Sequence, residues 1–364
     1  MTLRVAINGY GRIGRNLLRA FYEDAANCEC AGGHKAHNFE IVAINDVGSA
    51  ESLLHLTRYD TTHGAFRGDI TLVEQAGQEY LAVNSGAQGG GDQSGDYQSA
   101  DSRVAVYHHA SPADCPWAEL NIDVVLECTG LFRAKAEAAQ HLQAGAKAVV
   151  IGAVSFDEVD NTIVYGVNHE SYSADQHIIS NASCTTHCIA PLLKMFDQQW
   201  GIKEVLMTEI HPYTSDQSLL DKTHRDLRRA RAGAQNLIPT TSSSIGAVQK
   251  VLPQLQGKID GYSMRVPTIN VAAVDLTLRF ETPCTVEDIN ALVSQQAAEQ
   301  WQGIVGYCAE PLVSSDFIHR AESAIFDATQ TKALGELCKI TAWYDNEWGY
   351  TQRLIDLLDF MAMQ

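Results

Sequence analysis

The stretch RVAINGYGRIGRNLLRA, residues 4–20, decides the fold. Residues 4–8 form a short β-rich run that predicts a strand, and a helix is expected from about Gly14 to Asp24. Between them lies a match to the G-x-G-x-x-G pattern, Gly9-Tyr10-Gly11-Arg12-Ile13-Gly14. Glycines at these positions permit a tight turn, let the backbone approach a pyrophosphate and allow helix and strand to pack closely. This context predicts a dinucleotide-binding site, with phosphates held at the helix N-terminus.

The next strand ends at the acidic residue that such a site requires. The run FEIVAIN, residues 39–45, is followed directly by Asp46. Asp46 lies further from the glycine motif than the usual spacing of about 20 residues. An inserted segment at residues 28–38 accounts for the delay. A carboxylate here can bind the adenine ribose hydroxyls and repels a 2′-phosphate, so Asp46 favours NAD over NADP as the cofactor.

The alternation of elements indicates the fold class. Strands expected at residues 123–128 and 148–151 flank a helix expected at residues 134–144. Continuous apolar strands that alternate with helices predict a Rossmann-type, doubly wound α/β domain with a parallel sheet. Residues 270–280 instead alternate apolar and polar side chains, which is typical of a half-buried antiparallel strand.

These patterns predict an NAD-binding domain over residues 1–183 and a catalytic domain over residues 184–345. The second domain is expected to be α+β with a largely antiparallel sheet. A C-terminal helix within residues 346–364 is expected to pack back on the first domain. Two Gly-rich, small-polar segments, residues 28–38 and 84–102, are interpreted as inserted surface loops.

Composition narrows the class of partner. The chain has 364 residues with Lys+Arg 26 and Asp+Glu 44, a formal net charge of −18, which disfavours nucleic acid and anionic membranes as partners. Neither a secretory signal core nor an apolar run long enough to span a bilayer is apparent in the sequence. The odd count of nine cysteines is typical of reduced thiols, and a cytoplasmic location is expected.

One cysteine stands at the expected start of a helix. SNASCTTHC, residues 180–188, precedes the amphipathic run in which Ile189, Leu192 and Phe196 share a face. A thiol at a helix N-terminus is expected to have a lowered pKa, because the helix dipole and free amides stabilise the thiolate. A histidine can complete the activation, and the sequence leaves both His187 and His211 open.

Other interpretations of the same residues are possible. Cys184 can be a buried structural thiol, as free cysteines often are. A metal site built from Cys184, His187 and Cys188 lacks a fourth ligand, and the Cys and His residues of segment 28–38 have no feature that fixes a geometry. No metal is therefore predicted.

Ten segments, in order across nearly the whole chain, resemble glyceraldehyde-3-phosphate dehydrogenase. They are NGYGRIGR (8–15), AIND (43–46), YDTTHG (59–64), ECTG (127–130), YGVNH (165–169), SNASCTT (180–186), HPYTSDQ (211–217), DLRRARAGAQNLIP (226–239), RVPTINV (265–271) and WYDNEWGY (343–350). The resemblance implies that Cys184 is the nucleophile and His211 the base. The thiolate attacks D-glyceraldehyde 3-phosphate, a hydride passes to NAD, and inorganic phosphate releases 1,3-bisphosphoglycerate from the thioester.

The resemblance also assigns binding residues. Those implied for the cofactor are Gly9, Gly11, Arg12, Ile13, Gly14, Asp46, Thr129 and Asn346, the last holding the nicotinamide amide. Those implied for the substrate phosphate and the attacking phosphate are Ser183, Thr185, Thr214, Arg229, Ser242, Ser243 and Arg265. The Cys184 N–H is expected to bind the oxyanion, and the resemblance implies a homotetramer.

Several positions depart from the family pattern. His187 replaces the usual Asn beside the nucleophile, and Ser242-Ser243 replaces a Thr-Gly pair. Residues 107–112 lack an Arg often found near the adenine, and Lys222-Thr223 stands where NAD-specific members carry Leu-Pro. Lys222 can therefore tolerate the 2′-phosphate of NADP, although Asp46 favours NAD.

Two alternative functions follow from these observations. Erythrose-4-phosphate dehydrogenase is a close relative that shares YDTTHG and RVPTINV, whereas YDNEWGY and the Thr214-containing HPYTSDQ favour the glyceraldehyde-3-phosphate enzyme. The departures also leave open a weakly active paralogue that senses redox state through Cys184.

Overall fold

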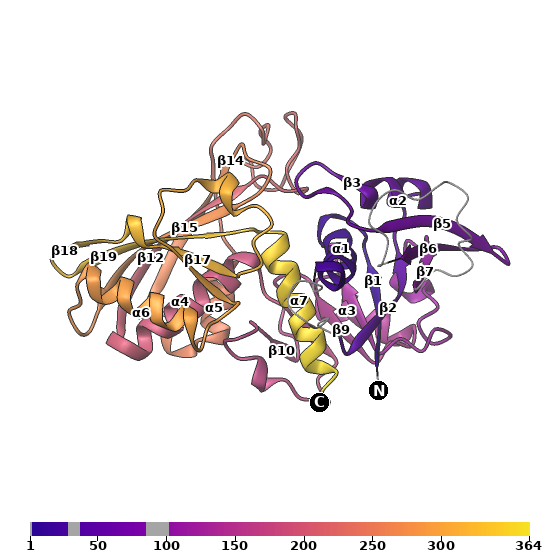
Figure 1. Cartoon of the computed structure of the whole chain (residues 1–364), viewed down its shortest axis with the longest axis horizontal. Helices are drawn as coiled ribbons and strands as arrows, with labels where there is room; N and C mark the ends of the chain where they lie inside the picture. The colour runs from indigo at the N-terminus through magenta and orange to yellow at the C-terminus, as the bar shows by residue number, and fades with distance from the viewer. Residues whose placement is uncertain (1, 28–36, 85–101) are drawn as a thin grey trace. The chain divides into compact units, whose positions relative to one another are not determined.

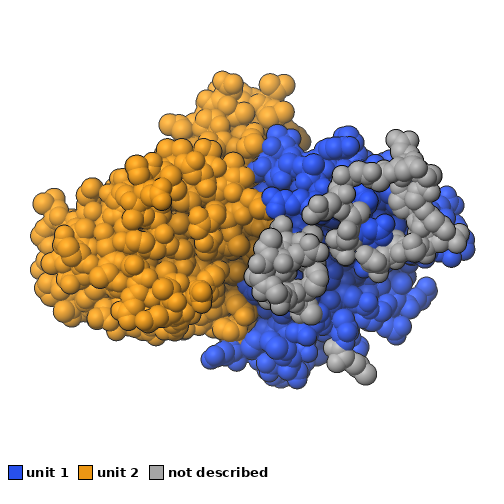
Figure 2. All heavy atoms as spheres, in the orientation of Figure 1, with its two compact units in different colours: residues 1–162, 170–181, 354–364 blue, residues 163–169, 182–353 orange. Residues whose placement is uncertain are grey.

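The computed structural model describes residues 2–27, 37–84 and 102–364, which form two compact units (Figures 1 and 2). Unit 1 comprises residues 1–162, 170–181 and 354–364, and unit 2 comprises residues 163–169 and 182–353. The segments interpreted as inserted loops, 28–38 and 84–102, lie outside the described residues except at their ends.

Unit 1 contains a nine-stranded sheet with the order β10-β11-β9-β8-β1-β2-β7-β6-β5. The pairs from β10 to β7 are parallel, and β7, β6 and β5 pair antiparallel at one edge. Its strands are β1 (Leu3–Asn8), β2 (Phe39–Asn45), β5 (Asp69–Gln75), β6 (Gln78–Asn84), β7 (Ser102–Tyr107), β8 (Val124–Glu127), β9 (Ala148–Ile151), β10 (Asn161–Thr162) and β11 (Ile178–Ser180). Its helices are α1 (Arg12–Asn27), α2 (Ala50–Arg58) and α3 (Lys135–Gln143), and β3 (Tyr59–Asp60) pairs separately with β4 (Gly64–Ala65).

The central strands of unit 1 are buried along their length because both faces of the sheet are covered. Every residue of β8 and of β9 is buried, and in β1 the residues from Val5 to Asn8 are buried. Each fully buried Val or Ile side chain stabilises the fold by about 1.5–3 kcal/mol. Continuous apolar runs in the sequence are the signature of such doubly covered strands.

Unit 2 contains a largely antiparallel eight-stranded sheet with the order β13-β14-β12-β15-β19-β17-β16, and β18 pairs with β19. Only the pairs β12–β14 and β16–β17 are parallel within the described residues. Its strands are β12 (Ile202–Pro212), β13 (Ile238–Thr240), β14 (Ile259–Val266), β15 (Ala272–Phe280), β16 (Val305–Cys308), β17 (Ala324–Asp327), β18 (Lys332–Leu334) and β19 (Leu337–Tyr344). Its helices are α4 (Cys184–Trp200), α5 (Ser244–Val251) and α6 (Val286–Ala298).

Helix α4 is the central helix of unit 2. It packs against β12, β15, β17 and β19, and α5 packs beside it (Figure 1). Helix α7 (Trp348–Met361) begins in unit 2, and its residues from Leu354 onward belong to unit 1. In unit 1, Asp359 of this helix accepts hydrogen bonds at 2.9 Å from His37 and at 2.8 Å from the Asn38 N–H.

The predicted fold class is confirmed: a parallel-rich α/β sheet precedes a mixed domain with a largely antiparallel sheet. Within the described part of the chain, no helix is both long enough and apolar enough to cross a membrane.

Candidate active site

The glycine-rich turn between β1 and α1 has the geometry that a pyrophosphate requires. Gly9 has a φ of +89°, and a Cβ there would lie 2.5 Å from the Thr129 backbone nitrogen. A Cβ at Gly14 would overlap the carbonyl oxygen of Gly9. A Cβ at Gly11, in contrast, would meet nothing within 4 Å. Gly9 and Gly14 therefore permit close packing, whereas Gly11 leaves open space beside the backbone, as the approach of a phosphate requires.

Asp46 lies beside this turn. Its carboxylate accepts hydrogen bonds at 2.8 Å from the N–H groups of Tyr10 and Gly48. Each carboxylate oxygen has a further lone pair, so the group can still accept ribose hydroxyls. The Arg12 guanidinium pairs with both oxygens of Asp60, and although burial raises the pKa of Asp60, the hydrogen bond from Arg12 helps lower it to about 2. The backbone N–H of Arg12, rather than its paired side chain, is the group suited to a phosphate.

A buried polar network joins the carboxyl ends of β1 and β8. Glu127 accepts hydrogen bonds from Asn8 at 2.6 Å, from His141 at 3.1 Å and from the Thr129 N–H at 2.8 Å, and it also accepts one from the Thr129 hydroxyl. Trp117 donates to the other ring nitrogen of His141 at 3.0 Å. The network fixes Thr129 in place opposite Gly9.

In unit 2, Cys184 is the first residue of α4. Ser183 caps the helix, since its Oγ accepts the Thr186 N–H at 3.0 Å. The preceding residue, Ala182, has a φ of +50°. This sharp entry makes Cys184 the N-terminal residue of a helix whose first N–H groups lack intrahelical partners.

His211 is the histidine in contact with the thiol. Its Nε2 lies 3.5 Å from Cys184 Sγ, whereas His187 Nδ1 lies 3.1 Å from the Ser183 carbonyl oxygen. The parallel register of β12 and β14 pairs His211 with Arg265, and Arg265 Nη1 lies 2.7 Å from His211 Nδ1. The Pro212 carbonyl oxygen lies 2.8 Å from the same nitrogen. Because a guanidinium only donates, Nδ1 accepts from Arg265 in this arrangement; Nε2 can take a proton from the sulfur in the other tautomer, in which Nδ1 donates its proton to the Pro212 carbonyl.

The prediction that the helix N-terminus lowers the pKa of the thiol is wrong. The pKa of Cys184 is raised to about 12, chiefly by burial and next by Glu209, and Arg265 opposes the rise only in part. The pKa of His211 is lowered to about 4, chiefly by burial and next by Arg265. Burial therefore disfavours the charged forms of both groups, and charges nearby decide how readily the thiolate forms.

Thr185, the second residue of α4, takes part in a buried hydrogen-bond chain. Its hydroxyl donates to Glu209 Oε1 at 2.8 Å and lies 2.7 Å from the Tyr344 hydroxyl. All three side chains are buried. The hydroxyl proton of Thr185, a residue implied for phosphate binding, therefore points at a carboxylate.

The remaining residues implied for phosphate binding lie in the segment after β12 and at the start of α5. Arg229 donates to Asp216 at 2.7 Å, to the Thr240 hydroxyl at 2.9 Å and to the Thr241 carbonyl at 3.2 Å. Partly buried Ser242 and exposed Ser243 precede α5, and Thr214 is partly buried. Hydroxyl groups at a helix N-terminus suit an anion.

The side-chain oxygen of Asn346 is an acceptor that can bind the amide N–H₂ of a ligand. It is 9% exposed, and its buried Oδ1 has no hydrogen-bond partner within the described residues. Its neighbour Asp345 fixes the segment, because it accepts the N–H groups of Glu347 and Trp348 at 2.9 and 2.8 Å. A carboxamide N–H₂ of nicotinamide is a suitable donor to the free Oδ1.

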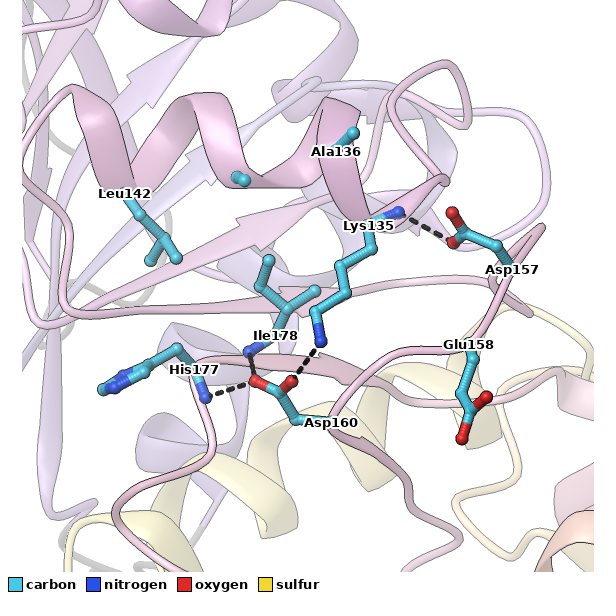
Figure 3. A pocket seen from close by; sticks show the side chains of 9 residues that line it. Lys135, Ala136, Leu142, Asp157, Glu158, Asp160, His177 and Ile178 are labelled. Atoms are coloured by element: carbon cyan, nitrogen blue, oxygen red, sulfur yellow. Dashed lines mark hydrogen bonds and ion pairs between the residues drawn. The ribbon is translucent and has the colours of Figure 1, made fainter.

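A separate hollow of about 580 Å³ lies along one face of α3 (Figure 3). Its charged groups bind one another: Lys135 Nζ contacts Asp160 at 2.7 Å, and Asp160 also accepts the N–H groups of His177 and Ile178. None of the residues predicted for catalysis or binding lines it. Among the residues described, no group of three or more His, Cys, Asp or Glu side chains is arranged to hold a metal ion.

Comparisons with known proteins identify the family. Residues 3–87 match the NAD binding domain of glyceraldehyde 3-phosphate dehydrogenase, and residues 183–346 match the C-terminal domain of the same enzyme. The plasmid glyceraldehyde-3-phosphate dehydrogenase of Cupriavidus necator is 48% identical over 98% of this chain and 97% of its own length. The Pseudomonas aeruginosa enzyme is 46% identical over the same shares, and a chloroplastic enzyme of Arabidopsis thaliana is 43% identical over 99% of this chain and 84% of its own length.

The chain belongs to the glyceraldehyde-3-phosphate dehydrogenase family. The resemblance seen in the sequence motifs is confirmed, and the relatives' names favour neither the erythrose-4-phosphate alternative nor a redox sensor.

His187, which departs from the family pattern, is buried within unit 2. Its ring lies edge-on to Tyr350 at 5.6 Å, and its Nε2 has no hydrogen-bond partner within the described residues. Burial lowers the pKa of His187 to about 3. His187 therefore stays neutral and contributes packing to α4.

Sequence reasoning missed Glu209. It lies two residues before His211 on the same buried face of β12. The sequence did carry a signal for it, because a carboxylate stands at a position where the alternating pattern of the strand calls for an apolar side chain.

Proposed function

We propose that this protein is an NAD-dependent, phosphorylating glyceraldehyde-3-phosphate dehydrogenase. It converts D-glyceraldehyde 3-phosphate, NAD and inorganic phosphate into 1,3-bisphosphoglycerate through a thioester on Cys184. The observation that carries the proposal is the 3.5 Å contact between Cys184 Sγ and His211 Nε2 at the start of α4. Family membership over nearly the full chain supports the same reaction.

The catalytic roles follow from the protonation of the pair. His211 takes the proton of Cys184 as the sulfur attacks the aldehyde carbon, so a hemithioacetal forms beside an imidazolium. The Cys184 N–H donates to the developing oxyanion. NAD, when bound, supplies the hydride acceptor for the oxidation. His211 gives its proton to the oxyanion, which becomes the hydroxyl of the hemithioacetal, and takes that proton back as the hydride leaves. Inorganic phosphate then attacks the remaining thioester, and the departing sulfur regains the proton from His211.

The cofactor is held by groups of the glycine turn and by two side chains. The N–H groups at the start of α1 bind the pyrophosphate beside Gly11, and Asp46 accepts the ribose hydroxyls. Asn346 Oδ1, which has no partner among the residues that the structure describes, accepts the nicotinamide amide. Gly9, Gly14, Ile13 and Thr129 shape the turn.

Two anion sites hold the substrate phosphate and the attacking phosphate. Arg265 and Arg229 supply the positive charges, and hydroxyl groups supply neutral donors. The residues assigned are Ser183, Thr185, Thr214, Arg229, Ser242, Ser243 and Arg265. Ser183 Oγ caps α4 as an acceptor and can still donate its own proton, whereas the Thr185 hydroxyl donates to Glu209, so Thr185 binds through its backbone N–H.

A homotetramer and a cytoplasmic location complete the proposal. Leu206 and Ile210 lie on the outward face of β12, and Tyr262 lies on the neighbouring strand β14. Their exposed apolar surface supports burial against another copy of the chain. The free thiols of the described cysteines agree with a reducing compartment. Light scattering of the purified chain tests the assembly, and a monomeric mass at micromolar concentration contradicts it.

The function is tested by following NADH formation with glyceraldehyde 3-phosphate or erythrose 4-phosphate, with and without inorganic phosphate. We expect turnover of glyceraldehyde 3-phosphate that depends on phosphate and is faster with NAD than with NADP. Cys184→Ser should abolish it. Faster turnover of erythrose 4-phosphate, or appreciable activity of Cys184→Ser, contradicts the proposal.

A further inference from the structure

Strand β12 presents two polar side chains to the buried side of the unit 2 sheet. Glu209 and His211 are each 4% exposed, and they follow buried Val205 and Met207 on the same face. Residues two apart on a strand share a face, so these two polar groups are immediate neighbours. A carboxylate here replaces the apolar side chain that the rest of the face carries.

The first two residues of α4 contact these two side chains in parallel. Cys184 Sγ lies 3.5 Å from His211 Nε2, and Thr185 Oγ1 donates to Glu209 Oε1 at 2.8 Å. Because Thr185 uses its proton on the carboxylate, the Tyr344 hydroxyl at 2.7 Å donates to Thr185. Glu209 thus fixes the turn of helix that carries the nucleophile.

The other carboxylate oxygen, Glu209 Oε2, is buried and has no hydrogen-bond partner within the described residues. A buried carboxylate is costly unless a positive charge offsets it. His211 becomes such a charge each time it accepts a proton.

We propose that Glu209 is a positioning residue that holds Thr185 and stabilises the protonated imidazole of His211 during turnover. The role in turnover rests on the proposed function, whereas the effect on the Cys184–His211 pair does not.

The charged groups around Cys184 and His211 shift the pKa values of these two residues in known directions. Burial is the largest influence, raising the pKa of Cys184 and lowering that of His211, and Glu209 raises both. Arg265 on β14 lowers both, and Arg229 lowers that of His211. Cys188 of α4 and Tyr344 of β19 also lie within electrostatic range of Glu209, and burial keeps both protonated by raising their pKa values.

Glu209→Gln keeps the shape and the acceptor for Thr185 but removes the charge. The thiol then ionises more readily, while His211 becomes a weaker base. We therefore expect alkylation of Cys184 by iodoacetamide, measured without substrate, to begin about 0.5–1 pH unit lower than in the wild type. Turnover should fall about tenfold with KM for the aldehyde little changed. Local loosening would also expose Cys184 and lower its pKa, so the faster alkylation supports the proposal only if the Tm of Glu209→Gln matches the wild type and Thr185→Val, which loses the hydrogen bond to Glu209, does not show it.

Two further variants act as controls. Thr185→Val removes the hydrogen bond and retains the carboxylate, so its alkylation should begin at or above the wild-type pH. Glu209→Asp retains the charge, so alkylation of Cys184 in this variant should begin at the wild-type pH. This variant keeps the test informative if Glu209→Gln fails to fold.

An alkylation onset that is unchanged or higher in folded Glu209→Gln overturns the proposal, as does a lower onset in folded Glu209→Asp. If the wild type fails to oxidise glyceraldehyde 3-phosphate, the proposed function fails, but the alkylation profiles still decide the effect of Glu209 on the pair.

Discussion

Two glycines of one motif should respond to alanine in opposite ways. Gly11 is the residue before α1, and a methyl group there meets nothing within 4 Å, so Gly11→Ala leaves the fold intact. Alanine in place of glycine at this N-cap costs at most about 1 kcal/mol. The added methyl occupies the space through which a pyrophosphate approaches. We expect the Kd for NAD to rise at least about tenfold, which corresponds to about 1.4 kcal/mol.

Gly14→Ala is the matched variant. Its methyl overlaps the carbonyl oxygen of Gly9 and would lie 3.0 Å from the Ile7 side chain, so the backbone of the turn must move. Overpacking of this kind costs about 3 kcal/mol. For a unit of this size, that lowers Tm by about 6–12 °C.

The assay is thermal unfolding followed by circular dichroism, together with calorimetric titration of NAD into each variant. Wild-type affinity for NAD in Gly11→Ala would refute the assignment of the open space to the pyrophosphate. An unchanged Tm in Gly14→Ala would refute the packing argument.

Three further substitutions test single residues. His211→Asn should lower kcat by about 10²–10⁴-fold with NAD affinity unchanged, and a loss below tenfold would contradict its role as the base. Asp46→Asn should lower the preference for NAD over NADP in kcat/KM at least about tenfold, because the charge that repels a 2′-phosphate is gone; an unchanged preference would speak against this. Burial lowers the pKa of His187 from 6.5 to about 3, so the unfolded chain binds more protons than the folded protein between these values, and the free energy of unfolding falls as the pH is lowered. When the pH is lowered from 7 to 5, the free energy of unfolding measured in urea should therefore fall about 2 kcal/mol less in His187→Asn than in the wild type. An equal fall in the two proteins would contradict the argument.

The sequence predicted the features that depend on residues close together in the chain, namely strands, helix starts and turns. Residues 39–45 and 148–151 are predicted strands with the observed bounds of β2 and β9, because both are short runs rich in apolar residues and are followed by Asp46 and Gly152. The helix predicted to start at Cys184 does so, since Ser183 is a favourable N-cap. The glycine pattern predicted the turn because backbone conformation and close packing restrict these positions to glycine.

Features that depend on distant segments were not predictable from the sequence. The residues alone left His187 and His211 both open, and only the resemblance chose His211; in the fold β12 packs against α4, and His211 is the one of the two that reaches the sulfur. The predicted direction of the thiol pKa was wrong because burial raises it, and local sequence does not reveal burial. The pairing of Thr185 with Glu209 likewise requires two elements in register.

Trapping the acyl-enzyme is the most direct measurement of the central claim, that the Cys184 sulfur becomes covalently acylated. The protein is mixed with glyceraldehyde 3-phosphate and NAD without inorganic phosphate, quenched in acid and mapped by mass spectrometry. We predict one acyl group on Cys184 for each NADH formed, and its loss when phosphate is added before quenching. An acyl group on another residue, or phosphate-dependent turnover with Cys184 unmodified, would contradict the account.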